Sequence, residues 1–443
     1  MNRRQALQSI ALVSLGAALA GCKSGTSAGP GTGSKSGAPS SNSSGTVAPG
    51  PSGVLAVNAA RMTPGPATRA GADLTEFGVR VLLKDAQIGA TSNGSISPYS
   101  IYAALAMTDA GARGTTQAQL DKLLGGDQQR QAGNITAIDA AVAKAVAASK
   151  SGRGKPTVVR AANSLWPDKS LPVRHAYLEQ LSSGYGAQLH VVDYKNDPAG
   201  ATEQINDWVS ERTNKLIPHL LGPGSVTAAT RLELVNALYL KAAWQEAFGD
   251  PGKPSAFTTA AGTQVQVPYM EVETQMVTAH GTGWESVTIP YQGGGMAMTV
   301  VLPAKGTFAQ IRSSLAHVLT TATSAKRARA VDLSMPAFSI DTSSQLAPTL
   351  QSLGVTQLFG SADLSGIAGK PGEIQVNSVV HQSVVKVDQH GTEAAAATAV
   401  GIQAGAVPQQ LPERIMVDRA FFFVIHDTTT GAPLFLGQIA DPT

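Results

Sequence analysis

The spacing of hydrophobic residues changes along the chain. In the first half, apolar side chains recur every three or four positions, for example at Leu74, Phe77 and Val81, and this spacing is typical of one face of an α-helix. In the second half, β-branched and aromatic residues form short runs, such as Val379-Val380 and Val384-Val385, which favour strands. Helices followed by strands predict an α+β fold with a large mixed β-sheet.

These patterns predict individual elements, and a capping signal supports one of them. Helices are predicted at residues 72–87, 99–110, 116–124, 137–148 and 202–213. Strands are predicted at residues 158–165, 232–241, 296–302, 331–340 and 378–387, with a closing hairpin at 421–426 and 433–439. Ser97 before Pro98 indicates a helix start, because a serine hydroxyl caps the first turn and proline is tolerated there.

The N-terminal residues have the pattern of an export signal. Residues 1–22 begin with the basic pair Arg3-Arg4, continue as an apolar run and end in small residues, as in a secretory signal peptide. Leu19-Ala20-Gly21-Cys22 resembles the bacterial lipobox, in which the cysteine is lipidated and becomes the new N-terminus. We therefore expect lipid attachment at Cys22, with a plain signal peptide as the alternative.

A change in composition separates this leader from the rest of the chain. Residues 23–53 are dominated by Ser, Gly and Pro, and such a segment buries too little apolar surface to fold. We expect a flexible tether here and a single domain over residues 54–443. The protein is then extracytoplasmic, either anchored to the cell membrane by the N-terminal lipid alone or secreted.

The overall charge excludes several classes of protein. The chain has 443 residues, with 33 Lys and Arg against 30 Asp and Glu, and charged residues make up 14%. This balance excludes a highly charged disordered chain and a polybasic nucleic-acid binder. No apolar stretch of about 18 residues follows the N-terminal segment, so we also exclude a polytopic membrane protein.

The sequence carries no recognisable catalytic or metal-binding motif. Cys22 is the single cysteine, which rules out a disulfide framework and a cysteine-based zinc site. The eight histidines form no i, i+4 pair, and hydrolase, phosphate-loop and dinucleotide-binding motifs are absent. A Ser/His/Asp triad stays open, because its members are scattered in any sequence. We expect no metal, no cofactor and no nucleic-acid partner.

The most unusual segment is residues 387–402. Read with a period of two, one face carries Thr392 and then Ala, Thr, Val and Ile, while the other begins at Glu393 and continues with Ala and Gly. One uncharged face of small and β-branched residues is compatible with a central strand, and the segment runs into a loop rich in Pro, Gly and Gln. A loop that can become a strand is a candidate conformational switch. An Ala-rich helix followed by a loop is the alternative.

At this point the sequence resembles the serpin family, from about Gly71 to Pro442. The resemblance rests on many ordered blocks, at residues 95–101, 103–107, 111–116, 163–166, 205–209, 213–217, 234–239, 379–382, 391–395, 421–425 and 434–438. It implies a serpin-like fold with N-terminal helices, a large central mixed sheet, further sheets and an exposed reactive loop at about 389–412. It also implies that the protein is a protease inhibitor and not an enzyme.

The family resemblance implies a mechanism. A target protease cleaves the loop and becomes acylated, and the freed loop then inserts into the central sheet, which distorts the trapped protease. The partner is therefore a serine protease held in a covalent acyl complex, and the inhibitor acts as a monomer. No Lys or Arg occurs between Gly391 and Pro412, which disfavours trypsin-like targets and favours elastase-like or subtilisin-like ones.

The resemblance also assigns residues in the loop. The hinge consists of Gln389, Gly391, Thr392, Glu393, Ala394, Ala395, Ala396 and Ala397. Counting from Gly391 places the scissile bond at Gly405–Ala406, with Ala404, Val407, Gln409 and Gln410 as alternatives. Gly391 frees the backbone where the chain turns into the sheet, and the alanines are small enough to enter it. The family usually has Glu at position 389 and Lys at position 337; here both partners of that ion pair are replaced, by Gln389 and Ala337.

A second set of residues is assigned to the place where the sheet opens. Ser97, Ser100, Asn206 and His381 match positions of a hydrogen-bond network beneath the central sheet, and Trp244 matches a residue at the top of the sheet where insertion begins. Two other functions stay open. One is a non-inhibitory serpin acting as a carrier or chaperone-like binding protein, and the other is a lipid-anchored hydrolase.

Overall fold

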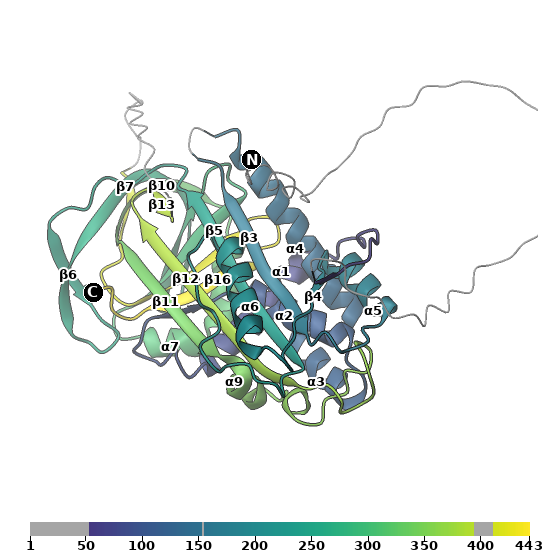
Figure 1. Ribbon diagram of the computed structural model, residues 1–443. Helices are drawn as coiled ribbons and strands as arrows, with labels where there is room; N and C mark the ends of the chain where they lie inside the picture. Colours follow the sequence, from purple (N-terminus) through teal and green to yellow (C-terminus); the bar gives the residue numbers. More distant parts are fainter. Residues whose placement is uncertain (1–52, 153–154, 394–410) are drawn as a thin grey trace, which may run out of the picture. The chain divides into compact units, whose positions relative to one another are not determined.

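Helices dominate the first half of the chain and strands the second, as the sequence predicts (Figure 1). The computed structural model describes residues 53–152, 155–393 and 411–443. Its helices are α1 (Ala67–Lys84), α2 (Pro98–Ala110), α3 (Gly114–Leu124), α4 (Gln128–Ser149), α5 (His175–Gln180), α6 (Pro198–Arg212), α7 (Phe308–Ser313), α8 (Leu315–Ser324) and α9 (Leu346–Ser352). The predicted helix start is confirmed, because the Ser97 hydroxyl accepts a hydrogen bond from the Ser100 N–H at 3.2 Å.

The described residues include a five-stranded mixed sheet with the strand order β11-β12-β13-β5-β3. Its strands are β3 (Val158–Pro167), β5 (Leu232–Ala243), β11 (Phe338–Gln345), β12 (Val376–Asp388) and β13 (Gly391–Thr392). β12 runs parallel to β5 and antiparallel to β11 and β13. This mixed pairing, beside the helices, confirms the predicted α+β class.

A second sheet of nine strands carries most of the remaining chain that the structure describes. In spatial order its strands are β14 (Glu413–Met416), β10 (Ala328–Pro336), β7 (Gln264–Gly281), β8 (Trp284–Pro290), β9 (Met296–Pro303), β15 (Phe421–Asp427), β16 (Pro433–Ile439) and β2 (Gly94–Ile96), and β6 (Pro254–Thr258) also pairs with β7. β15 and β16 are antiparallel neighbours, which confirms the predicted C-terminal hairpin. Two short strands, β1 (Val54–Leu55) and β4 (Leu189–His190), pair separately.

The five-stranded sheet is buried on both faces. On β5, Val235 and Ala237 belong to a smaller core with Ile205 of α6, whereas Leu234 and Leu238 belong to the larger core. Side chains of a strand alternate between faces, so the two cores lie on opposite sides of the sheet. Figure 1 shows α6 lying over β3 and β5, and α6 therefore marks one face of the sheet.

One predicted strand is in fact two strands. The pattern predicts a single strand over 331–340, but the structure divides these residues between β10 and β11, which belong to different sheets. β10 ends at Pro336, which has no N–H to donate to a ladder, and the chain crosses to the other sheet at Ala337. The hydrophobic pattern misses this break because buried apolar residues lie on both sides of it, although their spacing changes phase at Ala337.

The predictions for the N-terminus fall outside the described residues. The leader at 1–22 with Cys22, and the tether apart from its last residue, Gly53, are not among them. Within the ranges that the structure describes, no helix is long and apolar enough to cross a membrane. In the same ranges, no group of three or more His, Cys, Asp or Glu side chains is placed to hold a metal ion.

Candidate functional site

The chain reverses direction at the end of β12 and enters the five-stranded sheet again. β12 ends at Asp388, Gln389 and His390 form the turn, and β13 returns antiparallel to β12. The Asp388 carboxylate accepts hydrogen bonds from the N–H groups of His390 at 2.8 Å and Gly391 at 3.1 Å. An aspartate that bonds the backbone just after it stabilises a tight turn. The sequence therefore builds a defined turn where the hinge is predicted.

β13 occupies a position between β12 and β5. Thr392 pairs with Val387 on one side and with Ala242 on the other. Further along the sheet, β12 pairs directly with β5, and this parallel ladder ends at Gln382 and Ala237 in the described part of the chain. The two strands are thus joined at one end of the sheet and separated by β13 at the other. A segment continuing from β13 in the same direction would enter between them.

Gly391 is required by the close approach of β13 to β5. Its φ of +150° lies in a region that other residues rarely adopt. A Cβ at this position would lie 2.1 Å from the Ala242 carbonyl oxygen, far inside van der Waals contact. The sequence-based assignment of Gly391 to the point where the chain enters the sheet therefore has a steric explanation.

Two aromatic side chains support the hinge. The Thr392 hydroxyl lies 2.6 Å from the Tyr291 hydroxyl, and the Tyr291 ring stacks on the Trp244 ring at a centroid distance of 4.5 Å. Trp244 Nε1 donates to the Asp388 carbonyl at 2.9 Å, and the Trp244 N–H donates to the His390 carbonyl at 3.0 Å. Trp244, which the sequence assigns to this end of the sheet, therefore contacts the turn directly. Tyr291 was not predicted, and nothing in its sequence neighbourhood marks it.

Glu393 ends the described part of the hinge in an unusual conformation. Its φ of 51° is left-handed, which costs a residue with a Cβ free energy. Its N–H still donates to the Lys386 carbonyl at 2.9 Å. The side chain is half-buried, and one carboxylate oxygen has no hydrogen-bond partner among the described residues. Burial raises the pKa of this carboxyl, while the charges of Lys241 and Lys386 act in the opposite direction.

Of the remaining residues predicted for the loop, the structure describes Gln389. The Gln389 amide donates to the Asp250 carboxylate at 3.4 Å, and the Gln389 carbonyl accepts from the Phe248 N–H at 2.9 Å. The polar contact of Gln389 is thus with the segment after β5. The other predicted loop residues lie outside the described residues: Ala394, Ala395, Ala396, Ala397, Ala404, Gly405, Ala406, Val407, Gln409 and Gln410.

A buried histidine links the two strands where they are still paired. His381 of β12 lies opposite Asn236 of β5, and His381 Nδ1 is 2.6 Å from Asn236 Oδ1. The Ser97 N–H donates to His381 Nε2 at 3.0 Å. Because Nε2 accepts, Nδ1 carries the ring proton and donates to Asn236. Ser97 and His381, both assigned from the sequence, therefore meet, and Asn236 completes the group.

Burial lowers the pKa of His381 to about 4, and the hydrogen bond with Asn236 opposes that shift. A protonated ring would direct a second N–H at the Ser97 N–H, which is itself a donor. The arrangement therefore favours the neutral imidazole for two independent reasons, desolvation and hydrogen-bond geometry.

A second pair of hydroxyls extends the network toward the edge of the sheet. The Ser95 hydroxyl of β2 lies 2.9 Å from the Ser383 hydroxyl of β12, and the Ser95 N–H donates to the Thr342 hydroxyl of β11 at 3.1 Å. Ser100 is joined to this group only by its backbone N–H, which donates to the Ser97 hydroxyl in the helix cap, and its assigned role stays a prediction. The Ser100 hydroxyl is buried and has no partner among the described residues.

The prediction that Asn206 belongs to this network is wrong. Asn206 lies on α6. Its Oδ1 accepts a hydrogen bond from the Leu221 N–H at 2.8 Å, and its Nδ2 donates to the Leu221 carbonyl at 2.9 Å. α6 packs on the face of the sheet opposite to the one that carries His381, so the two side chains cannot meet. Asn236 takes the assigned position. A lone asparagine inside the apolar run of β5 was the available signal for it.

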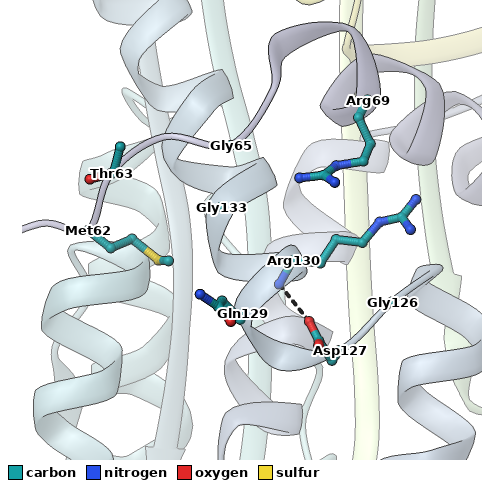
Figure 2. Close-up of a pocket in the computed structure, with 9 residues that line it drawn as sticks. All are labelled: Met62, Thr63, Gly65, Arg69, Gly126, Asp127, Gln129, Arg130 and Gly133. Carbon is teal, nitrogen blue, oxygen red and sulfur yellow. Dashed lines mark hydrogen bonds between the residues drawn. The ribbon is translucent and has the colours of Figure 1, made fainter.

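Two cavities in the described part of the chain are not lined by hinge residues. The larger, about 520 Å³, lies between the start of α1, the start of α4 and residues 62–65. Figure 2 shows Arg69 and Arg130 extending into the same space, but Arg130 is paired with the Asp73 carboxylate at 2.6 and 2.9 Å. The smaller, about 270 Å³, is lined by Trp166 and Trp208 beside α6. The candidate site is therefore the hinge and its network.

Comparisons with known proteins agree on one family. A family model described as serpin (serine protease inhibitor) matches residues 72–442. Serpin-Z2A of Oryza sativa subsp. japonica is 34% identical over 424 residues, which is 84% of this chain and 97% of the relative. The leukocyte elastase inhibitor of Bos taurus is 33% identical over 384 residues, which is 83% of this chain and 98% of the relative.

Solved structures show the same fold. Native tengpin, a thermophilic serpin, has a TM-score of 0.72 at 24% identity and covers 87% of this chain and 97% of its own; at that identity it shows the fold alone. Serpin48 of the insect Tenebrio molitor has a TM-score of 0.70 at 26% identity and covers 84% of this chain and 98% of its own. The protein therefore belongs to the serpin family of serine protease inhibitors.

Proposed function

We propose that this protein inhibits serine endopeptidases by covalent conformational trapping. The protease cleaves the loop after β13 and forms an acyl bond to its new C-terminus. The freed segment continues β13 as a strand between β12 and β5 and carries the protease with it. The observation that carries the proposal is the position of β13, whose two residues already lie between β12 and β5.

The arrangement around this position supports insertion. β12 and β5 are separated by β13 at one end, while their direct ladder begins again at Gln382 and Ala237. Insertion must therefore break the contact between His381 and Asn236, which bridges the two strands. In exchange, the new strand gains ladder hydrogen bonds on both of its edges. The contact between His381 and Asn236 would thus hold the two strands together until the entering loop separates them.

The composition of the loop supports an elastase-like or subtilisin-like target. With Gly405–Ala406 as the scissile bond, the protease pocket receives a side chain without charge or bulk, as elastase-like pockets accept. The similarity to a protein named leukocyte elastase inhibitor agrees with this preference. We therefore propose that one inhibitor molecule, acting as a monomer, traps one such protease.

The test is a protease panel analysed by denaturing electrophoresis. The full-length protein is mixed with pancreatic elastase, subtilisin and trypsin, and a stable adduct is expected with elastase or subtilisin and not with trypsin. Elastase whose active-site serine has been blocked is the control and should give no adduct. Mass analysis of the released C-terminal peptide locates the cleaved bond. Cleavage without any adduct would contradict the mechanism, and an adduct confined to trypsin would contradict the specificity.

We also propose that the inhibitor works outside the cytoplasm, anchored to the membrane through a lipid on Cys22. The export pattern of residues 1–22 and the following Ser/Gly/Pro-rich segment support this location. In a bacterial host, radiolabelled palmitate should label the full-length protein and not its Cys22→Ser variant, which should leave the membrane fraction. Equal labelling of both proteins would overturn the anchor.

A further inference from the structure

The register of β13 places two lysines beside the position of Glu393. Thr392 pairs with Val387 and with Ala242, so the next residue of an antiparallel strand stands opposite Lys386 on β12 and Lys241 on β5. The pairing with β12 already extends that far, because the Glu393 N–H donates to the Lys386 carbonyl at 2.9 Å. The described pairing with β5 stops at Thr392.

Both lysines face the same side of the sheet. On β5, Lys241 is four residues after Ala237 and therefore on the same face of the strand. On β12, Lys386 is two residues after Val384 and likewise shares its face. Ala237 and Val384 belong to the core beneath α6, and alternation places the lysines on that side as well. Thr392 points to the opposite side, where its hydroxyl meets Tyr291, so a Glu393 in strand conformation would face the lysines.

In the structure Glu393 has not reached that conformation. Its φ of 51° is left-handed and not that of a strand, and one carboxylate oxygen is buried without a hydrogen-bond partner among the described residues. Both features are unfavourable. A change to extended backbone between two ammonium groups would relieve both of them.

The residues that follow cannot define the register of an inserting strand by themselves. Ala394, Ala395, Ala396 and Ala397 are identical side chains in the sequence, so a strand displaced by two residues would pack almost equally well. A displacement of one residue would turn the Glu393 carboxylate to the opposite side of the sheet, where Thr392 meets Tyr291, and a displacement of two would separate it from the lysines. The contact of the one Glu393 carboxylate with the two lysines would therefore favour the correct register over registers displaced by one or two residues.

We propose that Lys241 and Lys386 form a cationic pair that receives the Glu393 carboxylate as the loop enters the sheet, and thereby fixes the register of insertion. This inference rests on the proposed function. Lys241 and Lys386 are positioning residues and do not contact the protease. Lys241 and Lys386 lie on the two strands that flank β13, whose backbones are about 10 Å apart at the usual strand spacing, and a carboxylate between the two ammonium groups reduces their mutual repulsion.

The test compares lysine variants with the wild type. In the variant Lys241→Gln/Lys386→Gln, we expect the number of inhibitor molecules consumed per protease trapped to rise several-fold, because slower or misregistered insertion allows hydrolysis of the acyl bond. Raising the ionic strength from about 0.05 to about 0.5 M should raise this number for the wild type and leave the variant unchanged. Lys122→Gln on α3 is the matched control. The charge exchange Glu393→Lys/Lys241→Glu/Lys386→Glu should restore efficient trapping.

A second readout measures the register without a protease complex. In a Cys22→Ser background, Gln382→Cys is combined with Ala397→Cys or with Ala395→Cys, the loop is cleaved, and disulfide formation is measured. Position 397 stands opposite position 382 in the proposed register, so the first pair should crosslink and the second should not. In the lysine variant we expect the second pair to crosslink as well.

Two outcomes would overturn the inference, and they differ from each other. If wild-type protein traps a protease while the lysine variant shows the same consumption ratio and the same crosslink pattern, the lysine pair has no role and the proposed function stands. If neither cysteine pair crosslinks after cleavage in protein that keeps both lysines, and the wild type forms no adduct, the loop does not insert, and the proposed function fails with the inference.

Discussion

A neutral imidazole at position 381 holds β12, β5 and the start of α2 together. Its Nδ1–H donates to Asn236, and its Nε2 accepts from the Ser97 N–H. Replacing the ring would leave two buried polar groups without partners, each at a cost of about 1–3 kcal/mol. At the scale of single residues, His381 and Gly391 are the two positions in the hinge region where we expect substitution to have the largest effect.

His381 should titrate well below an ordinary histidine. Its pKa is lowered to about 4 from 6.5 by burial. The unfolded chain therefore binds a proton at a pH where the folded chain does not, and the contribution of His381 to stability falls as the pH drops from about 6.5 toward 4. NMR of labelled histidines, assigned with His381→Gln, should give a midpoint near 4. A midpoint near 6.5 would contradict the buried neutral ring.

Gly391→Ala should expel β13 from its place beside β5. The new Cβ would lie 2.1 Å from the Ala242 carbonyl oxygen, and such overpacking costs about 1–3 kcal/mol. We expect faster amide hydrogen exchange at Ala242 and Ala243, and more inhibitor consumed for each protease trapped. Gly222→Ala is the control, because a Cβ there meets no atom within 4 Å. Unchanged exchange in Gly391→Ala would show that β13 tolerates the methyl group.

At the scale of elements, the parallel ladder between β5 and β12 contains buried polar side chains at two places along its length. Asn236 meets His381 in its middle, and the fully buried Glu233 accepts a hydrogen bond from the Ser378 hydroxyl near its start. The ladder is irregular between Val376 and Val379, where Ser378 lies. The second oxygen of Glu233 has no partner among the described residues, so its ionisation would weaken this end of the ladder.

Glu233→Gln should become more stable than the wild type as the pH rises. Burial raises the pKa of the Glu233 carboxyl from 4.5 to about 8, so the folded chain holds a proton that the unfolded chain releases. Wild-type stability is therefore lost between about pH 4.5 and 8, by at most about 1.4 kcal/mol per pH unit. The difference in Tm between variant and wild type should grow over this range. The exposed Glu203→Gln should show no such trend, and a constant difference for Glu233→Gln would refute the shift.

At the scale of the whole molecule, the proposed function requires that the five-stranded sheet accept one further long strand between β12 and β5. β13 supplies two residues between β12 and β5, whereas the 15 residues from Gly391 to Gly405 would extend about 50 Å as a strand. Under the proposed mechanism, the free energy of that addition becomes available when the loop is cut, and the intact protein is kinetically trapped above a more stable state.

Cleavage within the loop should raise the melting temperature. About 13 added ladder residues contribute on the order of 10 kcal/mol at about 1 kcal/mol per hydrogen bond, which for a chain of this length corresponds to roughly 10 °C or more. Calorimetry of the intact protein and of the loop-cleaved protein, with the protease inactivated in both samples, measures the difference. Equal melting temperatures would mean that the cut loop stays outside the sheet.

The sequence by itself determined the class of the fold and most of its long elements. The Ser97-Pro98 cap placed the start of α2, and short apolar runs placed the C-terminal strands, which are buried along their whole length. The ordered family motifs identified the hinge, since Gly391, Thr392 and Glu393 are adjacent in the chain and their pattern is local. The division of 331–340 into two strands was missed because buried apolar residues occur on both sides of Pro336, although the buried positions change from odd (Val331, Leu333, Met335) to even (Phe338, Ile340).

Only the tertiary structure decided which side chains meet across the sheet. Asn206 and Asn236 are both buried asparagines; the apolar run around Asn236 marks it as buried but does not name its partner. The sheet separates the two cores, with α6 and Asn206 on one side and the His381 side chain on the other. Asn236 lies on the same side as His381, and this pairing is visible only in the folded structure. The same holds for Tyr291 beneath Thr392 and for the two lysines beside Glu393, because long-range pairing is fixed by register and burial, which no local pattern encodes.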